Sequence, residues 1–341
     1  MSSSQVSNTY YKTVNVKKLD VNDYNKRIEN YKNLLKLFKN FNENKCLVTA
    51  KRKINNNETS IIKRSYYLGD TQIFLKKRMG NNSRYGTIFL STYNNNKFAI
   101  KLSPITHQNF REIILIKKLS KITEEDKNPH FILNYKFFIC NNKLEITDLP
   151  RLIQKNDYYI NINELVNGTF KDFLNFTSSI LLLNALQQIL IAILSFHYFT
   201  NGYFHNDCHS KNFLYLKIKP GGYFHYRIYN KDIYIKNLGF IWFIWDFGLV
   251  RTREKYIKRK LEDYFRILYG FLKYENYNSN SNNTIVIKSV LKILKFKKNY
   301  KSFFGNSDKL FFEELFKIPK LFNYTIPSMG TIINKNPYII E

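Results

Sequence analysis

The longest uncharged stretch of the chain runs from residue 173 to residue 206 and contains no Asp, Glu, Lys or Arg. Its centre, SILLLNALQQILIAILSF, is apolar, although the whole chain carries 54 Lys and Arg and 26 Asp and Glu residues. A helix that crosses a membrane needs about 20 predominantly apolar residues. Asn184, Gln187 and Gln188 interrupt this segment, and a polar amide is costly to bury in lipid. We therefore expect a buried core helix at Ser179–Phe199 and no transmembrane segment.

The composition is that of a folded protein. Of the 341 residues, 44% are hydrophobic and 17% are aromatic, which is too apolar for a disordered chain. A chain of this length forms one large or two medium domains with a substantial core. The formal net charge of +28 favours binding to polyanions such as nucleic acid, phospholipid or an acidic protein. The alternative is that A/T-rich codons and a solvated basic surface account for the charge.

The three cysteines, Cys46, Cys140 and Cys208, are far apart in the sequence and lack CxxC spacing. This pattern predicts neither a disulfide-stapled architecture nor a cysteine-based metal site, and it is typical of a reducing compartment. The first residues are polar and Ser-rich, without the apolar run of a secretory signal. We therefore expect an intracellular protein that is not secreted.

Hydrophobic periodicity divides the chain into three parts and predicts an α+β fold. Residues 1–72 are expected to form an N-terminal tail and an amphipathic helix. Residues 73–166 form a β-rich lobe with one prominent helix, and residues 167–341 form a mainly helical lobe with a C-terminal helical extension. In the second lobe, two aromatic-rich strands at 223–236 predict an extra β-hairpin. Three strands are expected early in the first lobe, at Ile73–Arg78, Thr87–Thr92 and Lys97–Leu102.

The strongest chemical signal is the segment HNDCHSKN at 205–212, followed by DFG at 246–248. Asp207 offers a carboxylate that can accept a hydroxyl proton, and Asn212 offers an amide oxygen that can bind a metal. Asp246 supplies the hard anionic oxygen that Mg²⁺ prefers when it bridges nucleotide phosphates. Each motif alone is a weak signal, so the prediction depends on what surrounds them.

Two further motifs precede this segment. Lys101, at the end of the strand FAIK, can reach nucleotide phosphates and pair with a carboxylate of the next helix. Glu112 in REIIL is the candidate for that carboxylate. Gly80 and Gly86 bracket a predicted turn between two strands, where backbone amides could contact phosphates.

With these motifs in this order, the chain resembles eukaryotic-type protein kinases over residues 73–274. A narrower resemblance, to the serine/threonine protein kinases of large nucleocytoplasmic DNA viruses, is carried by HNDCHSKNFLY, KPGGYFHY and WDFGL. The resemblance implies a bilobal fold that binds ATP and Mg²⁺ in a cleft, in a protein of the host cytoplasm or the virion. Adenine would be recognised by the connection NELV, through Glu164 and Val166, and sandwiched by Ile88 and Ala99.

The chain departs from the family pattern at several positions. The glycine loop lacks its middle glycine, and His209 stands where the family has a Lys two residues after the catalytic Asp. A histidine can stabilise phosphoryl charge when it is protonated or through a neutral N–H, and nearby Lys211 could compensate. The distance in sequence from the strand Lys to Glu112 is short, which leaves Glu124 and Glu125 as weaker alternatives.

The segment after DFG is also unusual, because no APE motif follows it. Only the basic run at 251–260 separates it from the helix LEDYFRILYGFL, where Asp263 resembles the carboxylate that anchors the catalytic loop in kinases. So short a segment leaves little room for a peptide-docking platform, and its basic residues could face an acidic substrate or a phosphate. His205 is expected to orient the loop, and Cys208 to be buried and inert.

These observations predict a serine/threonine protein kinase that transfers the γ-phosphoryl group of ATP to a protein hydroxyl. Lys101, held by Glu112, would position the α- and β-phosphates, Asn212 and Asp246 would hold Mg²⁺, and Asp207 would orient and deprotonate the hydroxyl. One alternative is a small-molecule kinase of the same fold. The other is a basic pseudokinase that binds nucleic acid or virion components without turnover.

Overall fold

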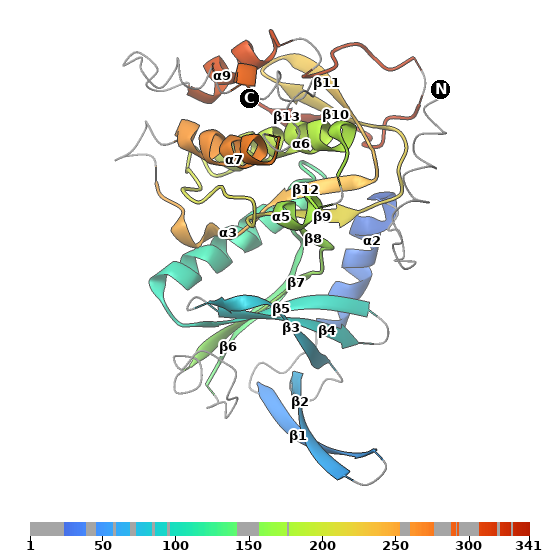
Figure 1. The fold of residues 1–341 in the computed structure, drawn as a ribbon, viewed down its shortest axis with the longest axis vertical. Coiled ribbons are helices and arrows are strands. Elements are labelled where there is room, and N and C mark those ends of the chain that lie inside the picture. Colours follow the sequence, from blue (N-terminus) through green and yellow to red (C-terminus); the bar gives the residue numbers. More distant parts are fainter. Residues whose placement is uncertain are drawn as a thin grey trace. The chain divides into compact units, whose positions relative to one another are not determined.

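The computed structural model describes residues 24–38, 46–56, 59–68, 73–83, 86–93, 96–141, 157–175, 177–252, 260–275, 288–290, 292, 307–318, 321–328 and 330–341. The predicted tail and most of the basic run at 251–260 lie outside these residues. The fold is α+β, as predicted, with mainly antiparallel sheets (Figure 1). The chain divides into two compact units, each described separately below.

Unit 2 comprises residues 28–120 and 132–166, and unit 1 comprises residues 1–27, 121–131 and 167–341. One boundary therefore falls between residues 166 and 167, where the sequence also changes from β-rich to helical. Residues 28–72, which the sequence pattern sets apart as an extension, belong to unit 2, and residues 121–131 belong to unit 1.

Unit 2 is built on one seven-stranded antiparallel sheet with the strand order β1-β2-β3-β4-β5-β7-β6 (Figure 1). The three strands expected early in the lobe are confirmed as parts of β3, β4 and β5. The helix α3 (His107–Glu124) follows β5, and its last residues belong to unit 1. The strands are β1 (Leu47–Asn56), β2 (Thr59–Leu68), β3 (Phe74–Ser83), β4 (Gly86–Tyr93), β5 (Asn96–Pro104), β6 (Asn134–Cys140) and β7 (Tyr158–Glu164).

Alternation along β5 separates the two faces of this sheet, because successive residues of a strand belong to opposite faces. Phe98, Ile100 and Leu102 are fully buried in the core of unit 2. This core is covered by the end of α2 (Tyr24–Leu35) and the short 3₁₀ helix η1 (Lys36–Phe38), whose Phe38 ring packs edge-to-face on Phe98 at 5.6 Å. Lys97, Ala99 and Lys101, which alternate with these residues, therefore lie on the other face of the sheet.

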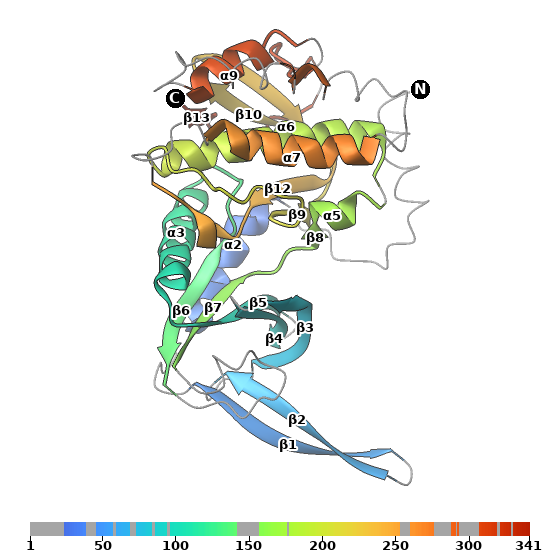
Figure 2. The ribbon, with the colours of Figure 1, turned by 60° about the vertical axis from the view of Figure 1, so that its left-hand side comes forward.

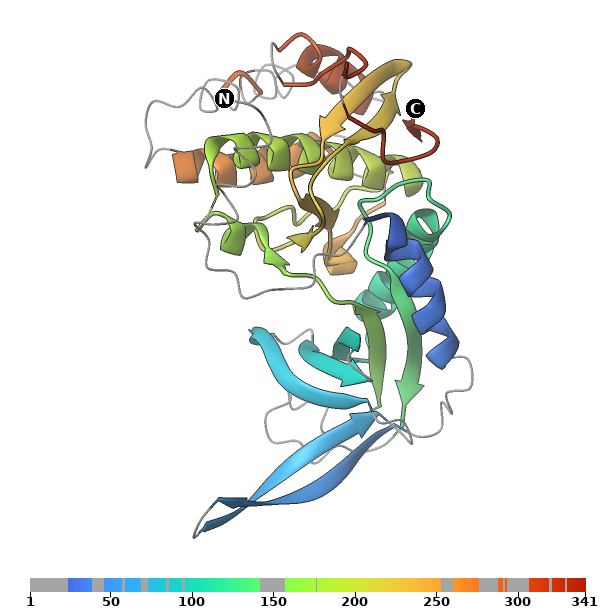
Figure 3. The same ribbon diagram turned by 90° about the vertical axis from the view of Figure 1, so that its right-hand side faces the viewer.

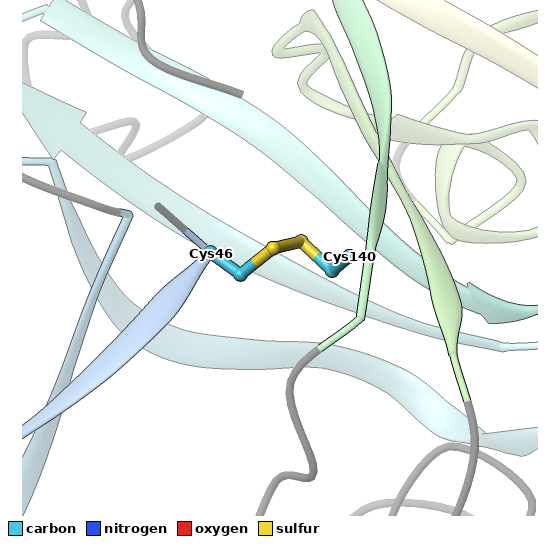
Figure 4. The surroundings of a disulfide bond; sticks show 2 residues. All are labelled: Cys46 and Cys140. Atoms are coloured by element: carbon cyan, nitrogen blue, oxygen red, sulfur yellow. A yellow bond between two sulfur atoms is a disulfide. The ribbon is translucent and has the colours of Figure 1, made fainter. Parts of the chain in front are cut away.

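A disulfide joins Cys46 to Cys140, with their Cα atoms 5.5 Å apart (Figure 4). Cys46 directly precedes β1 and Cys140 ends β6, so the bond links the first and last strands in the sheet order. The prediction that the cysteines are unpaired is wrong for these two, because the fold brings together residues 94 positions apart in sequence. The argument for a reducing compartment therefore no longer holds for this pair, while Cys208 is free and buried, as predicted.

Unit 1 contains two small sheets, with the orders β12-β9-β8 and β11-β10-β13. The long helix α6 (Ser179–Phe199) contacts β12 and runs beside α7, as Figure 2 also shows. The remaining elements are β8 (Gly168–Thr169), α5 (Phe170–Phe173), β9 (Phe213–Lys217), β10 (Tyr223–Ile228), β11 (Lys231–Lys236), β12 (Phe240–Ile244), the 3₁₀ helix η2 (Phe247–Leu249), α7 (Lys260–Glu275), α9 (Ser307–Leu315) and β13 (Tyr338–Ile340).

Within the described residues, α6 is one helix that is long and apolar enough to cross a membrane, but its amides are used inside unit 1. Asn184 donates to the carbonyl of Lys236 at 2.8 Å, and Gln188 donates to that of Phe240 at 3.1 Å. Gln187 donates to the carbonyl of Leu321. The prediction of a buried core helix is therefore confirmed, because the residues that interrupt the apolar run bind protein backbone.

The predicted extra hairpin is confirmed as β10 and β11, paired from Tyr223↔Lys236 to Ile228↔Lys231. Tyr229 and Asn230 form its two-residue turn, with positive φ angles of 45° and 64°. Positive φ at both central residues is typical of the type I′ turn, which suits the twist of a hairpin. The strand β13 then adds in parallel to β10, a pairing that the sequence pattern did not predict.

Candidate functional site

The loop that carries Asp207 connects α6 to β9 in unit 1, and Asp263 of α7 fixes its backbone. The amides of His205 and Asn206 donate to the two carboxylate oxygens of Asp263 at 2.6 and 2.8 Å. Asp263 is fully buried, so the hydrogen bonds to its charged carboxylate are strong. The expected anchoring role of Asp263 therefore agrees with its contacts.

Asp207 lies among three polar groups. The amide nitrogen of Asn212 donates to its carboxylate at 3.1 Å and to its backbone carbonyl at 2.9 Å. His209 Nε2 and Arg266 Nη1 lie 3.5 and 3.6 Å from its two carboxylate oxygens. Partial burial alone would raise the pKa of Asp207. The hydrogen bonds from His209 and from the Asn212 amide outweigh that effect and hold this pKa below its ordinary value. Asp207 is therefore an ionised acceptor at neutral pH.

His209 is held in one tautomer by the loop itself. The backbone N–H of Lys211 donates to Nδ1 of His209 at 3.2 Å, so in the neutral ring the proton lies on Nε2. That Nε2–H is the group nearest to Asp207, and the His209 side chain is about half exposed. The exposed Lys211 makes its described contact through its backbone, so it does not replace His209 beside Asp207.

Arg266 is a component of this loop environment that the sequence reasoning missed. It lies in α7, three residues after Asp263, and donates to the carbonyl of Asn206 at 2.5 Å. Residues three apart on a helix share a face, so both side chains face the same loop. That spacing was the available signal, because Asp263 was already identified as the anchor of the loop.

Asp246 joins β12 to η2 and has a left-handed backbone, with φ 67° and ψ 72°. This conformation costs a residue other than Gly of order 1–3 kcal/mol and is concentrated at functional sites. The adjacent Trp245 is tied to the Asp207 loop at both its backbone groups: its N–H donates to Asn212 O, and its carbonyl lies 2.9 Å from His205 Nε2. The segment containing Asp246 is therefore fixed against the loop that holds Asp207 and Asn212.

His205 acts between these two segments, as expected. Burial lowers the pKa of its imidazole, although Asp263, Asp246 and Asp207 all act to raise it. The neutral ring then donates its Nε2–H to the carbonyl of Trp245. Its Nδ1 is buried without a hydrogen-bond partner among the described residues, which also favours the ring without a proton there. His205 is therefore a structural link within the loop.

A second histidine, His197 of α6, lies beneath the loop and was not identified from the sequence. Its Nε2 lies 3.0 Å from Asp263 Oδ2, and its Nδ1 lies 2.9 Å from Asp308 Oδ1 of α9. The Tyr264 hydroxyl donates to the same Asp308 oxygen at 2.9 Å. Burial alone would lower the pKa of His197, but the two carboxylates raise it to about 9. The imidazolium thus links the anchor Asp263 to α9.

The predicted Lys101–Glu112 ion pair is present in unit 2. Lys101 Nζ lies 2.6 and 2.8 Å from the two carboxylate oxygens of Glu112, and both side chains are largely buried. Glu125, one of the weaker candidates, instead pairs with Lys127 at 2.6 Å in unit 1. A buried charge requires a partner, so this ion pair joins α3 to β5.

The residues of unit 2 that the sequence predicts to contact adenine, Ile88 and Ala99, lie near Lys101 in the sheet. Ile88 is opposite Lys101 in the β4–β5 register, and Ala99 lies two residues before Lys101 on the same strand. All three therefore belong to one face of the sheet. The prediction that Ile88 and Ala99 sandwich a base is wrong for that reason, because residues of one sheet face contact one side of a ring.

The two glycines of the predicted turn differ in position. The sequence predicts Gly80 at the start of the turn, and this prediction is wrong. β3 continues to Ser83, so Gly80 lies within an irregular part of that strand. Gly86 begins β4 with φ 148°, and a Cβ atom there would lie 2.6 Å from the carbonyl oxygen of Leu102. Gly86 is therefore a position that only glycine fits without a shift of the backbone.

The predicted adenine connection follows β7. The Glu164 amide donates to Leu133 O at 2.8 Å, and its carboxylate accepts from the Leu133 amide at 3.3 Å. Val166, half-buried, is the last residue of unit 2. These contacts use the Glu164 side chain and N–H inside unit 2, so neither is available to a base, and a role of Val166 in binding adenine stays a prediction.

The two residues of unit 1 that the sequence predicts as metal ligands are Asn212 and Asp246. Because the amide nitrogen of Asn212 faces Asp207, its amide oxygen remains as a ligand for a hard cation. Mg²⁺ is commonly held by one or two protein oxygens together with phosphates and water. The half-buried carboxylate of Asp246 and this amide oxygen fit that donor set.

The structure thus brings Asp207, His209 and Asn212 together in unit 1, and Lys101 and Glu112 together in unit 2. A search of models of known protein families and of curated protein sequences finds none that matches this chain.

Proposed function

We propose that the chain is an ATP- and Mg²⁺-dependent phosphotransferase that moves the γ-phosphoryl group of ATP to the hydroxyl of Ser or Thr in a protein. The observation that carries this proposal is the Asp207–Asn212 pair. The two residues are joined by a 3.1 Å hydrogen bond on a loop that the buried Asp263 anchors. An ionised, half-buried carboxylate beside a metal-compatible amide oxygen supports phosphoryl transfer to a hydroxyl, because the first can orient the hydroxyl and the second can hold Mg²⁺.

In the proposed mechanism, Asp207 accepts a hydrogen bond from the acceptor hydroxyl, orients its oxygen and takes its proton as the phosphoryl group is transferred. The low pKa of Asp207 makes it a weak base, so its main contribution is orientation. His209 Nε2–H and Arg266 supply positive potential beside the carboxylate. Mg²⁺, held by Asn212 and Asp246, would neutralise phosphate charge.

Lys101 has a different part in the proposal. Its ammonium, fixed by Glu112, would bind the α- and β-phosphates, while Ile88 and Ala99 on the same sheet face would contact one side of adenine. Unit 2 and unit 1 would then correspond to the two lobes of a bilobal, protein-kinase-like fold. The buried ion pair supports this proposal because Lys101 is an otherwise costly charge on a half-buried sheet face.

Transfer to a small molecule is the second candidate. The observation that favours it is the short connection between η2, which ends at Leu249, and α7, which begins at Lys260. So few residues leave little room for a surface that binds a peptide in extended form. A pseudokinase is the less favoured alternative, because the contacts of the Lys, Glu, Asp and Asn side chains are complete in each unit.

An assay with γ-labelled ATP tests the proposal. The full chain is incubated with and without Mg²⁺, first with mixed Ser/Thr-containing proteins and then with a panel of small hydroxyl compounds. We expect Mg²⁺-dependent label in protein. Label in small molecules alone would favour the second candidate. Binding of ATP without transfer of label to any acceptor and without release of labelled phosphate would favour the pseudokinase.

A further inference from the structure

Arg266 of α7 lies beside the carboxylate of Asp207, but the loop uses only part of its guanidinium. Its Nη1 donates to the carbonyl of Asn206 at 2.5 Å and lies 3.6 Å from Asp207 Oδ1. Among the residues that the structure describes, no hydrogen bond or ion pair involves Nε or Nη2 of Arg266, and the side chain is 44% exposed. One edge of the guanidinium is therefore open to a ligand from solvent.

The chemistry of that edge selects an anion. Carboxylate and phosphate groups accept a pair of parallel hydrogen bonds from the planar guanidinium fork, and such charge-assisted bonds are stronger than those between neutral groups. Asp207 does not fill the Nε–Nη2 edge, because its carboxylate lies near Nη1. A second anion could therefore bind Arg266 while Asp207 keeps its own contacts.

Other elements of unit 1 bring exposed cations to the same loop. The Lys171 amide of α5 donates to the carbonyl of Ser210 at 3.1 Å, which joins α5 to the loop. Arg251 and Phe204 exchange both backbone hydrogen bonds, at 3.1 and 3.2 Å, where the loop begins. Lys211 belongs to the loop itself, and the side chains of Lys171, Lys211 and Arg251 are all exposed. Exposed positive charge therefore reaches the loop from several separate segments.

The acidic residues on these segments offset only part of that charge. Asp172 of α5 is exposed, but its carboxylate accepts from the N–H and the hydroxyl of Thr169 at 2.9 and 2.8 Å. Asp207, Asp246 and Glu262 are less exposed, and the first two are assigned to the acceptor hydroxyl and Mg²⁺. The exposed charge at the loop is therefore mainly positive, and it favours an acidic ligand over a basic one.

The position of Arg266 limits where such a ligand can lie. In the proposed mechanism Asp207 accepts a hydrogen bond from the acceptor hydroxyl, and Arg266 Nη1 is 3.6 Å from that carboxylate. Residues of an extended peptide follow each other at about 3.3 Å, so an anion on the open edge would lie about one or two residues from the acceptor.

We propose that Arg266 is a specificity-determining residue, which binds an anionic side chain of the protein substrate one or two residues from the acceptor Ser or Thr. The anion is the carboxylate of Asp or Glu or the phosphate of a phosphorylated residue. Lys171, Lys211 and Arg251 add positive potential that favours acidic segments. This inference rests on the proposed function, because it names the substrate class of the same site.

The test compares peptides that contain one Ser in a neutral sequence. Asp, phosphoserine, Asn or Lys is placed at each position within two residues of that Ser, and kcat and KM are measured for the full chain. We expect kcat/KM to be about tenfold higher for an acidic peptide than for its Asn counterpart, and lowest for the Lys peptide. A gain with Asp identifies a carboxylate site, and a gain with phosphoserine alone identifies a phosphate site. Equal kcat/KM for the acidic, Asn and Lys peptides would overturn the proposal.

Arg266→Gln tests the residue itself. The ratio of kcat/KM between acidic and neutral peptides should fall from about ten to about one, because the fork is lost. A merely structural role would lower kcat/KM for both peptides equally and leave the ratio unchanged, which would overturn the proposal. Arg266→Lys, which keeps the charge but not the fork, should have an intermediate ratio.

The matched control is Arg227→Gln. Arg227 of β10 is 42% exposed and pairs with Asp232 at 3.0 Å, so it resembles Arg266 in exposure and in having an acidic neighbour. The helix α6 separates the β10–β11 hairpin from the β12-β9-β8 sheet beside the loop, as Figures 1 and 3 show. The acidic-to-neutral ratio should therefore be unchanged in Arg227→Gln, and an equal fall in the two variants would overturn the proposal.

A second variant does not depend on Arg266, whose contact with Asn206 also supports the loop. Lys171→Gln combined with Lys211→Gln changes exposed side chains, and its control combines Lys219→Gln with Lys309→Gln, which are also exposed. The acidic-to-neutral ratio should fall a fewfold in the first pair and stay constant in the control. Equal ratios in the two pairs would show that no positive potential acts at the loop.

Binding of a fluorescently labelled acidic peptide without ATP separates this inference from the proposed function. Its affinity should fall about tenfold in Arg266→Gln and should weaken as salt concentration rises, because salt screens exposed charges. Absence of transfer to every peptide would contradict the proposed function. Transfer that occurs without preference for acidic peptides, or acidic-peptide binding that is equal in Arg266→Gln, would contradict this inference alone.

Discussion

Individual side chains determine how well the Asp207 loop can work, and His209 is the most unusual of them. The loop amide of Lys211 holds the His209 ring with its Nε2–H near Asp207. A neutral N–H donor is thus available where a kinase-like loop has a lysine. Sequence reasoning identified the substitution, but it could not show which ring nitrogen would carry the proton, because that depends on the folded loop.

The first prediction concerns His209→Ala. We expect phosphoryl transfer to fall by about a hundredfold, the usual cost of removing one stabilising donor. The pKa of Asp207 should also rise, since His209 lowers it, so the acidic limb of the pH–rate profile should move to higher pH. His209→Lys should retain most of the rate. His225→Ala, a histidine of the β10–β11 hairpin, is the control. An unchanged profile in His209→Ala would contradict the assigned role.

The second prediction concerns His197 and Asp308. The pKa of His197 is raised from 6.5 to about 9, so its contribution to stability is full below pH 6.5 and is lost as pH rises through about 9. Asp308→Asn should cost about 3–5 kcal/mol near neutral pH and flatten the loss of stability over that range. The melting temperature measured from pH 6.5 to pH 9 tests this. Asp232→Asn, in an exposed ion pair, is the control, and equal pH slopes in both variants would contradict the network.

His197 and Asp308 also mark a limit of sequence reasoning at this scale. His197 is one of two histidines in a long uncharged stretch, but its partner Asp308 follows 111 positions later on a different helix. Neither spacing nor periodicity predicts that contact. Asp263, by contrast, was identified from the sequence because its position resembles that of the carboxylate that anchors the catalytic loop in kinases.

At the scale of elements, alternation and helical periodicity predicted β5 and α3, and the motifs FAIK and REIIL predicted the ion pair that joins them. Because Phe98 and Ile100 are buried in the core, the alternate residue Lys101 must lie on the other face of β5, towards Glu112 of α3. The β10–β11 hairpin was predictable for a similar local reason, its turn. The parallel addition of β13 was not, because residues more than a hundred positions apart form it.

The third prediction is that Glu112→Gln destabilises the protein by about 3–5 kcal/mol, because it removes the carboxylate charge from the buried Lys101 ammonium. Binding of ATP should weaken as Lys101 loses its fixed position. Chemical denaturation and ATP titration measure the two effects. Glu125→Gln, which breaks the exposed pair with Lys127, should leave the stability nearly unchanged, because solvent screens this pair. If the two variants lose equal stability, the Lys101–Glu112 pair does not hold β5 to α3.

The fourth prediction concerns the disulfide that links β1 to β6. When the chain is unfolded without reductant, only the Cys208 thiol should react with a thiol reagent. When it is unfolded with reductant, all three cysteine thiols should react. Cys140→Ser should lower stability by roughly 4 kcal/mol, as expected for closing a loop of this length. Cys208→Ser is the control for the loss of a sulfur. Three thiols in the unreduced chain would contradict the bond.

At the scale of the whole molecule, the sequence predicted the α+β class and the change of character near residue 166, because both follow from local pattern and composition. It did not predict that residues 28–72 belong to unit 2 or that Cys46 reaches Cys140. Both depend on which distant segments come together in the folded sheet, and no local pattern encodes that. The candidate site was found from motifs whose residues the fold then brings together within each unit.

The central claim is that Asp207 serves the transfer step and not the binding of nucleotide. The most direct test is to measure ATP binding and γ-phosphoryl transfer side by side for the unmodified chain, Asp207→Asn and the control Asp232→Asn. Asp207→Asn keeps the size and the Asn212 contact of the side chain but removes its charge. We expect ATP binding within a fewfold of the unmodified chain in both variants, and transfer abolished only in Asp207→Asn. Undiminished transfer by Asp207→Asn would contradict the account.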